Sequence, residues 1–159
     1  MRHPPPATWI VVLDSSRASF WRLQHDDDGN RRIDQVGTPM YSGLHAHARD
    51  VRSDQPGRYR RGGSLHQQDT FDTEHDPHKL EKQAFVRQVV ERLQTAHDAH
   101  EFVRLAIVAP ERTIGEMRAL ASEKLAATFW REIGKDLVKL DPGQLWTHIA
   151  PELVEHPPG

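Results

Sequence analysis

The chain has 159 residues, of which 36% are hydrophobic and 28% are charged, and its formal net charge at pH 7 is −2. This length fits one domain, and the near-neutral charge excludes a general electrostatic attraction to nucleic acid or membranes, although local clusters of one sign can still bind them. Because the sequence has no cysteine, it excludes disulfides, a thiolate nucleophile and cysteine-ligated zinc.

The N-terminal segment predicts neither a secretion signal nor a membrane span. Its apolar run over residues 9–13 is shorter than the roughly 7–15 residues of a signal sequence or the roughly 20 of a membrane-spanning helix. We therefore expect a cytoplasmic protein with no membrane partner. The proline-rich ends, residues 1–7 and 154–159, are expected to be disordered tails around a single domain over residues 8–153.

Three strands are predicted near the N-terminus. The continuous run of apolar, mostly β-branched residues at 9–13 is typical of a strand that is covered on both faces. Residues 18–24 predict a second strand, and residues 31–36 predict a weaker third strand near a sheet edge. Polar turn residues at 14–17 and 26–30 join them, so we expect an antiparallel meander.

A long helix and a buried strand are predicted next. Asp76-Pro77 is typical of a helix start, with aspartate as N-cap and proline in the first helical position. Apolar residues at three- and four-residue spacing continue the helix to Ala96, over about five turns. The apolar run over residues 102–109 predicts a second buried strand.

The C-terminal third predicts two helices around one strand. Thr113–Glu116 has the spacing of a capping box, which predicts a helix from there to Leu125. Residues 128–133 predict a fifth strand, and Asp141-Pro142 repeats the cap-and-proline signal before a last helix.

The resulting order, βββαβαβα, predicts the α/β class. Strands separated by a helix should run parallel, while the first three form hairpins, so we expect one domain with a mixed five-stranded sheet and helices packed on it. The runs at 9–13 and 102–109 should be the central strands. Ribonuclease-H-like proteins have the same element order.

Residues 38–76 show no regular pattern, and a loop of this length is usually functional or disordered. Five arginines lie within thirteen of its residues, beside one aromatic ring. Guanidinium groups bind phosphate oxygens in pairs, and an aromatic ring can stack on a base. We interpret this segment as a flexible basic arm for RNA; the alternative is a solvated, disordered loop without a specific partner. The candidate RNA-binding residues are Arg49, Arg52, Arg58, Tyr59, Arg60 and Arg61.

Histidines and carboxylates raise the question of a metal site. Spacing along a segment without regular structure defines no ligand geometry, so we expect surface histidines and no metal site. A two-metal nuclease would use Asp14 after the first strand with Glu81 and Asp136, although aspartate before two serines is also a common turn former. No phosphate-loop, dinucleotide or serine-nucleophile motif occurs, so we expect no cofactor. The histidines in the long segment and the following turn are His45, His47, His66, His75 and His78.

The chain resembles the bacterial host-attachment protein family over most of its length. The resemblance rests on the order of several short motifs. These are Trp9–Asp14 with Ala18, Asp54–Arg58, Asp76–His78, Phe85, Leu105–Pro110 with Arg112-Thr113, and Lys135–Leu137.

That family is similar to the central domain of archaeal and eukaryotic class-one peptide-release factors, which carry a Gly-Gly-Gln tip on the loop before the long helix. In those factors the tip helps water to attack the peptidyl-tRNA ester. Here the matching stretch has Gly62 and Gly63 but Ser64 in place of the glutamine, and Gln67 or Gln68 would substitute only in a differently folded loop. The resemblance therefore implies a ribosome-binding module, and we expect no termination activity. The candidate catalytic residues are Gly62, Gly63, Ser64 and Gln67.

Three functional hypotheses follow. The first is a ribosome- or RNA-binding module that acts through the arm at residues 49–68, in ribosome rescue or silencing. The second is a host-attachment protein that binds a protein or surface partner and has no nucleic-acid role. The third is a hydrolase, either an esterase at the loop tip or the nuclease centred on Asp14.

Overall fold

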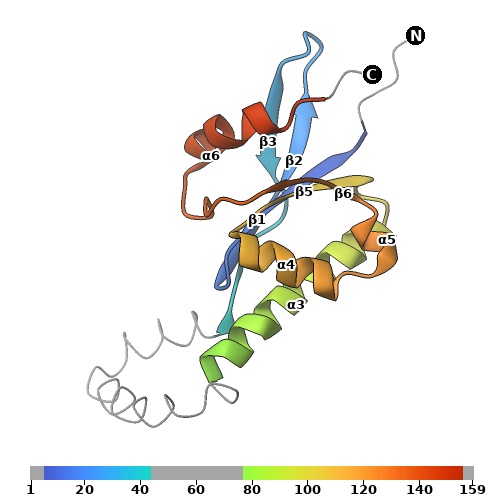
Figure 1. Ribbon diagram of the computed structural model, residues 1–159. Helices are drawn as coiled ribbons and strands as arrows, with labels where there is room; N and C mark the ends of the chain where they lie inside the picture. The colour runs from blue at the N-terminus through green and yellow to red at the C-terminus, as the bar shows by residue number, and fades with distance from the viewer. Residues whose placement is uncertain (1–5, 44–76, 156–159) are drawn as a thin grey trace.

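The computed structural model describes residues 6–43 and 77–155, and within these ranges a mixed sheet of six strands organises the chain (Figure 1). Strand order is β3-β2-β1-β5-β6, with β4 paired to β2. β1 is parallel to β5, β5 is parallel to β6, and the remaining pairs are antiparallel. The strands are β1 (Thr8–Leu13), β2 (Arg17–His25), β3 (Arg31–Gln35), β4 (Met40–Tyr41), β5 (Arg104–Val108) and β6 (Phe129–Ile133).

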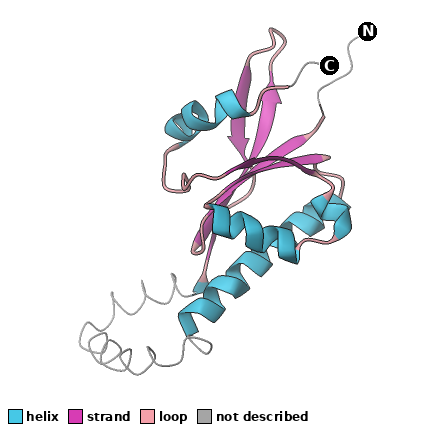
Figure 2. Ribbon diagram, viewed as in Figure 1, coloured by secondary structure: helices cyan, strands magenta, loops and turns pink. Residues whose placement is uncertain are grey.

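Helices cover both faces of this sheet (Figure 2). One core lies between the sheet and α3, α4 and α5, and a second core lies between the opposite face and α6. The strand β1 contributes alternate residues to the two cores: Trp9 and Val11 to the first, Ile10 and Val12 to the second. The helical elements are α3 (Pro77–Asp98), α4 (Glu111–Leu120), α5 (Glu123–Ala126), α6 (Pro142–Ile149) and the 3-10 turn η2 (Ala150–Glu152).

The predicted α/β class and mixed sheet are confirmed. β1 and β5 each have a neighbouring strand on both sides, as expected for the central strands. The predicted strands are all present, with ends that shift by at most two residues, which is within the usual uncertainty of element boundaries. The likeness to ribonuclease-H-like proteins in particular stays a prediction.

The described sheet has one strand more than the five that we predicted. Met40 and Tyr41 pair with Ala18 and Arg17 of β2, and the N–H of the next residue, Ser42, donates to the carbonyl of Ser16 at 2.8 Å. The prediction of irregular structure is therefore wrong for this part of residues 38–76. A strand of two residues has no alternation that a sequence pattern can detect, and only its pairing with β2 defines it.

The predicted capping box at Thr113 is wrong. The helix α4 begins at Glu111, because Pro110 already has the backbone geometry of an N-cap (φ −56°, ψ 147°). Thr113 consequently lies inside the helix and is only 5% exposed.

The helix that we expected to reach Leu125 is split into α4 and α5. Ala121 has an extended backbone (φ −71°, ψ 140°), which ends α4. The Ser122 side chain then accepts a hydrogen bond from the N–H of Leu125 at 3.1 Å and starts α5. Serine is a strong N-cap residue, so the break has a local cause that the periodicity of apolar residues concealed.

The last helix has the cap that its sequence predicts. The Asp141 carboxylate accepts a hydrogen bond from the N–H of Gln144 at 2.8 Å, and the Gln144 side chain accepts one from the N–H of Asp141 at 3.4 Å. Pro142 occupies the first helical position. This capping box holds α6 in place so that Leu145 and Ile149 are buried against the sheet.

Replacing Asp141 by alanine should destabilise the protein by about 1 kcal/mol, because the first turn of α6 loses its side-chain acceptor. Urea denaturation followed by circular dichroism measures the change. Lys139→Ala, at an exposed position two residues earlier, is the matched control and should have little effect. Equal denaturation midpoints for the two variants would show that the cap contributes nothing.

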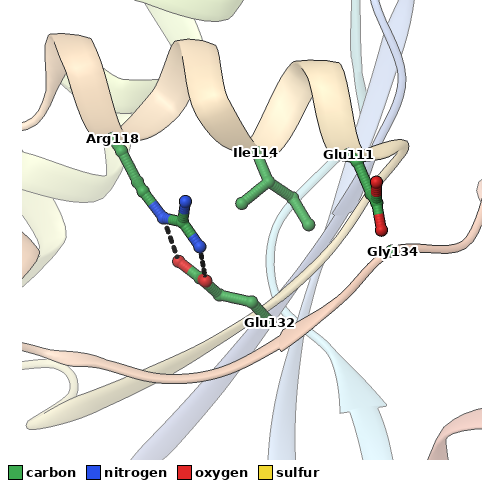
Figure 3. A pocket seen from close by; sticks show the side chains of 5 residues that line it. All are labelled: Glu111, Ile114, Arg118, Glu132 and Gly134. Atoms are coloured by element: carbon green, nitrogen blue, oxygen red, sulfur yellow. Dashed lines mark hydrogen bonds and ion pairs between the residues drawn. The ribbon is translucent and has the colours of Figure 1, made fainter.

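An ion pair joins α4 to the edge strand β6 (Figure 3). Arg118 Nε donates to Glu132 Oε2 at 2.8 Å, and Arg118 Nη2 donates to the other carboxylate oxygen. Hydrogen bonding to Glu132 raises the pKa of Arg118, and the same contact lowers the pKa of Glu132. The pair lines a hollow of about 360 Å³ together with Glu111, Ile114 and Gly134. Because these two charges satisfy each other, we regard the pair as a structural link.

The Arg118–Glu132 pair makes stability depend on pH in a defined direction. The folded-state pKa of Glu132 lies below its ordinary value of 4.5, so the pair stabilises the fold above that pH and loses its effect as the pH falls through the folded-state pKa. We expect Glu132→Gln to lower the thermal midpoint modestly at pH 7, with a difference from the wild type that shrinks in acid.

Thermal denaturation at several pH values checks this expectation. Glu91→Gln removes an equivalent charge from an exposed position on α3 and is the matched control. A Glu132→Gln difference that is constant from neutral to acid pH would contradict the proposed linkage.

Candidate binding groove

A hollow of about 510 Å³ opens at the carboxyl ends of the parallel strands β1 and β5. We call it the carboxyl-edge groove. Its lining comes from the turn after β1, the first turns of α3, the first turns of α4 and the connection after β6. The lining residues are Asp14, Ser15, Lys79, Lys82, Gln83, Pro110, Arg112, Thr113, Glu116 and Asp136.

Topology explains why the groove lies at this edge. β1 and β5 run parallel and end in register, with Val12 beside Val108, so the residues that follow both strands emerge together. The chain after β5 turns directly into α4 at Glu111. β4 pairs with the start of β2, which places the end of the described range 6–43 at the same edge. In open α/β sheets, ligands bind preferentially outside the carboxyl ends of parallel strands.

The groove presents three exposed cationic side chains that are weakly paired or unpaired within the described ranges. Lys79 and Lys82 are exposed and make no hydrogen bond or ion pair with any residue in 6–43 or 77–155. Arg112 Nε lies 3.7 Å from Glu116 Oε1, and the arginine side chain is 82% exposed. A pair this exposed contributes little energy, so the guanidinium is available to a ligand.

Acidic side chains share the lining. Asp14 Oδ1 accepts hydrogen bonds from the N–H of Ser16 at 2.8 Å, its hydroxyl at 3.0 Å and the N–H of Arg17 at 2.9 Å. This is the turn-forming role that the alternative interpretation of Asp14 predicts. Asp136 is exposed and has no hydrogen bond or ion pair within the described ranges.

The described fold does not bring together the three carboxylates that we considered for a nuclease site. Asp14 and Asp136 line the carboxyl-edge groove, but Glu81 does not; its carboxylate lies against Gly43 instead. Within residues 6–43 and 77–155, no group of three acidic or histidine side chains is arranged to hold a metal ion. Two-metal catalysis needs such a convergent set of carboxylates.

The groove includes residues that sequence patterns did not single out. Lys79, Lys82 and Arg112 are exposed basic residues on amphipathic helices, which are ordinary on a soluble protein. Only the meeting of α3 and α4 at one edge makes them a set. Thr113 appeared in the sequence as an N-cap; in the fold it is a buried residue whose hydroxyl makes no hydrogen bond to a described residue.

The candidate residues of the basic arm and of the Gly-Gly tip lie outside the described residues. Gly43 lies next to Glu81 of α3, however, so the described residues on either side of 44–76 meet at the carboxyl edge. The candidates concerned are Arg49, Arg52, Arg58, Tyr59, Arg60, Arg61, Gly62, Gly63, Ser64 and Gln67, with His45, His47, His66 and His75 and the side chain of His78.

At the other end of the parallel strands, the arginine side chains have partners within the protein. There Arg104 donates through Nε to the Thr8 hydroxyl at 2.6 Å, lies 3.7 Å from the Trp130 ring centre and pairs with Glu155. Hydrogen bonding to Arg104 lowers the pKa of Glu155. Arg31 Nη1 similarly donates to the carbonyl of Leu153 at 2.7 Å. These two arginines serve to hold the C-terminal segment, whereas the cations of the groove have no such role.

Comparison with known proteins gives a family and no curated relative. A family model described as "Protein required for attachment to host cells" matches residues 9–149, which run from β1 to the end of α6. No curated protein matches the chain. Among the described residues, no helix has the length and apolar composition that crossing a membrane requires. Because the matching family model extends over most of the sequence, the chain belongs to the family of proteins required for attachment to host cells.

Proposed function

We propose that this protein is a ribosome- or RNA-binding module, and that it binds through the carboxyl-edge groove together with the basic segment at residues 49–61. One observation carries the proposal. Lys79, Lys82 and Arg112, from two different helices, line a single groove next to the point where segment 44–76 leaves and rejoins the described chain.

Electrostatics supports an anionic partner. Lysine and arginine side chains bind nucleic-acid phosphates as point charges and as paired donors respectively. The three cations of the groove share its lining with three carboxylates, and we propose that they act together with the five arginines of residues 49–61 on a chain whose net charge is −2. A local basic region on a near-neutral protein favours a specific contact over general attraction to polyanions.

The resemblance to release-factor central domains also supports this proposal. In the present chain the Gly62-Gly63 pair precedes α3, which is the position of the corresponding tip in those factors. Ser64 replaces the glutamine of the tip, and neither histidine nor cysteine lines the groove as described. We therefore propose binding, in ribosome rescue or silencing, and no ester hydrolysis.

Replacing Arg58, Arg60 and Arg61 by alanine should weaken binding to single-stranded RNA and to ribosomes. Each lost phosphate contact removes about 0.7 from the slope of log K against log salt, so losing three should reduce that slope by about 2. Fluorescence anisotropy across a salt series measures the slope, and sucrose-gradient co-sedimentation measures ribosome association.

The matched control removes the same charge elsewhere. Arg22, Arg87 and Lys139 are exposed and lie outside the groove, so their triple alanine variant should bind RNA almost as the wild type does. If the wild type failed to associate with ribosomes at low salt under all growth and stress conditions tested, the proposal would be overturned. Equal losses in both triple variants would also count against it.

Host attachment through a protein or surface partner is the second candidate function. The family match favours it, and so do two exposed apolar side chains near the same edge of the sheet, Tyr41 of β4 at 46% and Leu80 of α3 at 52%. Exposed aromatic and aliphatic side chains are typical anchors in protein interfaces. This candidate requires the protein at the cell surface, whereas ribosome binding requires it in the cytoplasm.

Leu80→Asp should separate the two candidates. If the protein attaches cells to a host, bacteria that carry this variant should attach at least tenfold less, because one hot-spot side chain contributes about 2 kcal/mol or more. Val154→Asp, at a similarly exposed position outside the groove, is the control. Attachment counts and cell fractionation give the result; unchanged attachment by the Leu80 variant would oppose this candidate.

A further inference from the structure

The first turn of α4 offers backbone donors to the carboxyl-edge groove. Pro110, its N-cap residue, makes no side-chain capping hydrogen bond. The first backbone hydrogen bond of the helix is donated by Ile114 to the carbonyl of Pro110 at 3.1 Å. The N–H groups that precede it have no acceptor within the helix, and the N-terminus of a helix carries partial positive charge. Pro110 and Arg112 both line the groove, so these donors lie beside a cation.

Thr113 adds an independent polar group without a partner. The residue is 5% exposed and lines the groove, yet its hydroxyl makes no hydrogen bond to any residue in 6–43 or 77–155. Although the residue as a whole is buried, its hydroxyl oxygen remains accessible, and the groove that the residue lines gives that access. In a helix a threonine hydroxyl can bond to the carbonyl four residues earlier, but the Thr113 hydroxyl makes no such bond within the described ranges. This hydroxyl is well placed to donate to a ligand oxygen.

The acidic side chains of the groove can recognise hydroxyl groups of a ligand. Asp136 has no partner within the described ranges, and Asp14 uses only Oδ1 in its turn, so Oδ2 is free to accept. Carboxylates repel a bare anion but accept hydrogen bonds from hydroxyl groups. A lining that combines cations, N–H donors and free carboxylates suits a ligand that carries both a phosphate and hydroxyl donors.

We propose that the carboxyl-edge groove seats one ribonucleoside 5′-phosphate unit. The phosphate lies at the N-terminus of α4, where it receives hydrogen bonds from Arg112 and from the Thr113 hydroxyl, with Lys82 adjacent. The ribose hydroxyls donate to Asp136 and Asp14. This inference rests on the proposed RNA-binding function, because the unit is one nucleotide of an RNA strand. It adds that the groove distinguishes RNA from DNA through the 2′-hydroxyl.

Isothermal titration of the full chain with three probes tests the inference: adenosine 5′-monophosphate, its 2′-deoxy analogue and inorganic phosphate. We expect the ribonucleotide to bind about tenfold more tightly than the deoxynucleotide, because one hydrogen bond to a carboxylate is lost. Inorganic phosphate should compete with both. Absence of saturable binding of the ribonucleotide at millimolar concentration would overturn the inference.

Two variants test which residues bind the phosphate and which bind the ribose. Thr113→Val keeps the shape of the side chain without its hydroxyl, and should weaken both nucleotides about tenfold. Asp136→Asn should reduce the preference for the ribonucleotide while leaving the affinity for inorganic phosphate within about twofold of the wild type, because the neutral amide oxygen is a weaker acceptor than the carboxylate. Arg87→Gln, on α3 outside the groove, is the control for lost charge and should change nothing. Circular dichroism and thermal melts establish that each variant is folded. Wild-type affinities in both Thr113→Val and Asp136→Asn would refute the assignment.

The mononucleotide titrations and the RNA-binding experiments together separate this inference from the function on which it rests. RNA binding that depends on Arg58, Arg60 and Arg61 without any mononucleotide binding would overturn the groove site alone. Mononucleotide binding with a ribose preference, in a protein that binds neither RNA nor ribosomes, would support the site and overturn the proposed RNA-binding function.

Discussion

Each residue of β1 is at most 2% exposed, so this strand requires cover on both of its faces and a neighbour on both of its edges. The rest of the fold supplies that cover: α3 and α4 on one face, α6 on the other, β2 and β5 at the edges. Burial of this kind is the main favourable contribution to folding. Since β5 runs parallel to β1, the chain must cross the sheet between them, and α3 makes that crossing.

The carboxyl-edge groove follows from the same constraint. Two parallel strands that end in register place the turn after β1 and the start of α4 side by side, and the crossing helix brings its first turns to them. The two ends of the sheet therefore differ in whether their basic side chains have partners within the protein. At one end, Arg31 and Arg104 are engaged by the C-terminal segment. At the other end, Lys79 and Lys82 have no described partner. Charges that do not stabilise the fold are the better candidates for binding.

The family assignment and the groove point to different levels of function. The family description names a cellular process, attachment to host cells. The groove instead indicates which kinds of molecule the protein could contact. The exposed cations of the groove fit an anionic partner, and the exposed Leu80 of α3 fits an apolar one. These two kinds of contact differ in their dependence on salt, because displaced counterions contribute only to the first.

The sequence by itself determined the α/β class, the buried strands at 9–13 and 102–109 and the capped helix α6, because each of these has a local cause: an apolar run, a periodicity or an aspartate-proline cap. The composition of residues 49–61 also identified them as an arginine-rich segment. Only the tertiary structure decided β4, which exists through its pairing with β2, and the groove, whose Lys82 and Arg112 come from different helices. The burial of Thr113 in the first turn of α4 likewise depends on where Pro110 starts that helix. Such features arise from contacts between residues far apart in the chain, and a local pattern contains no information about them.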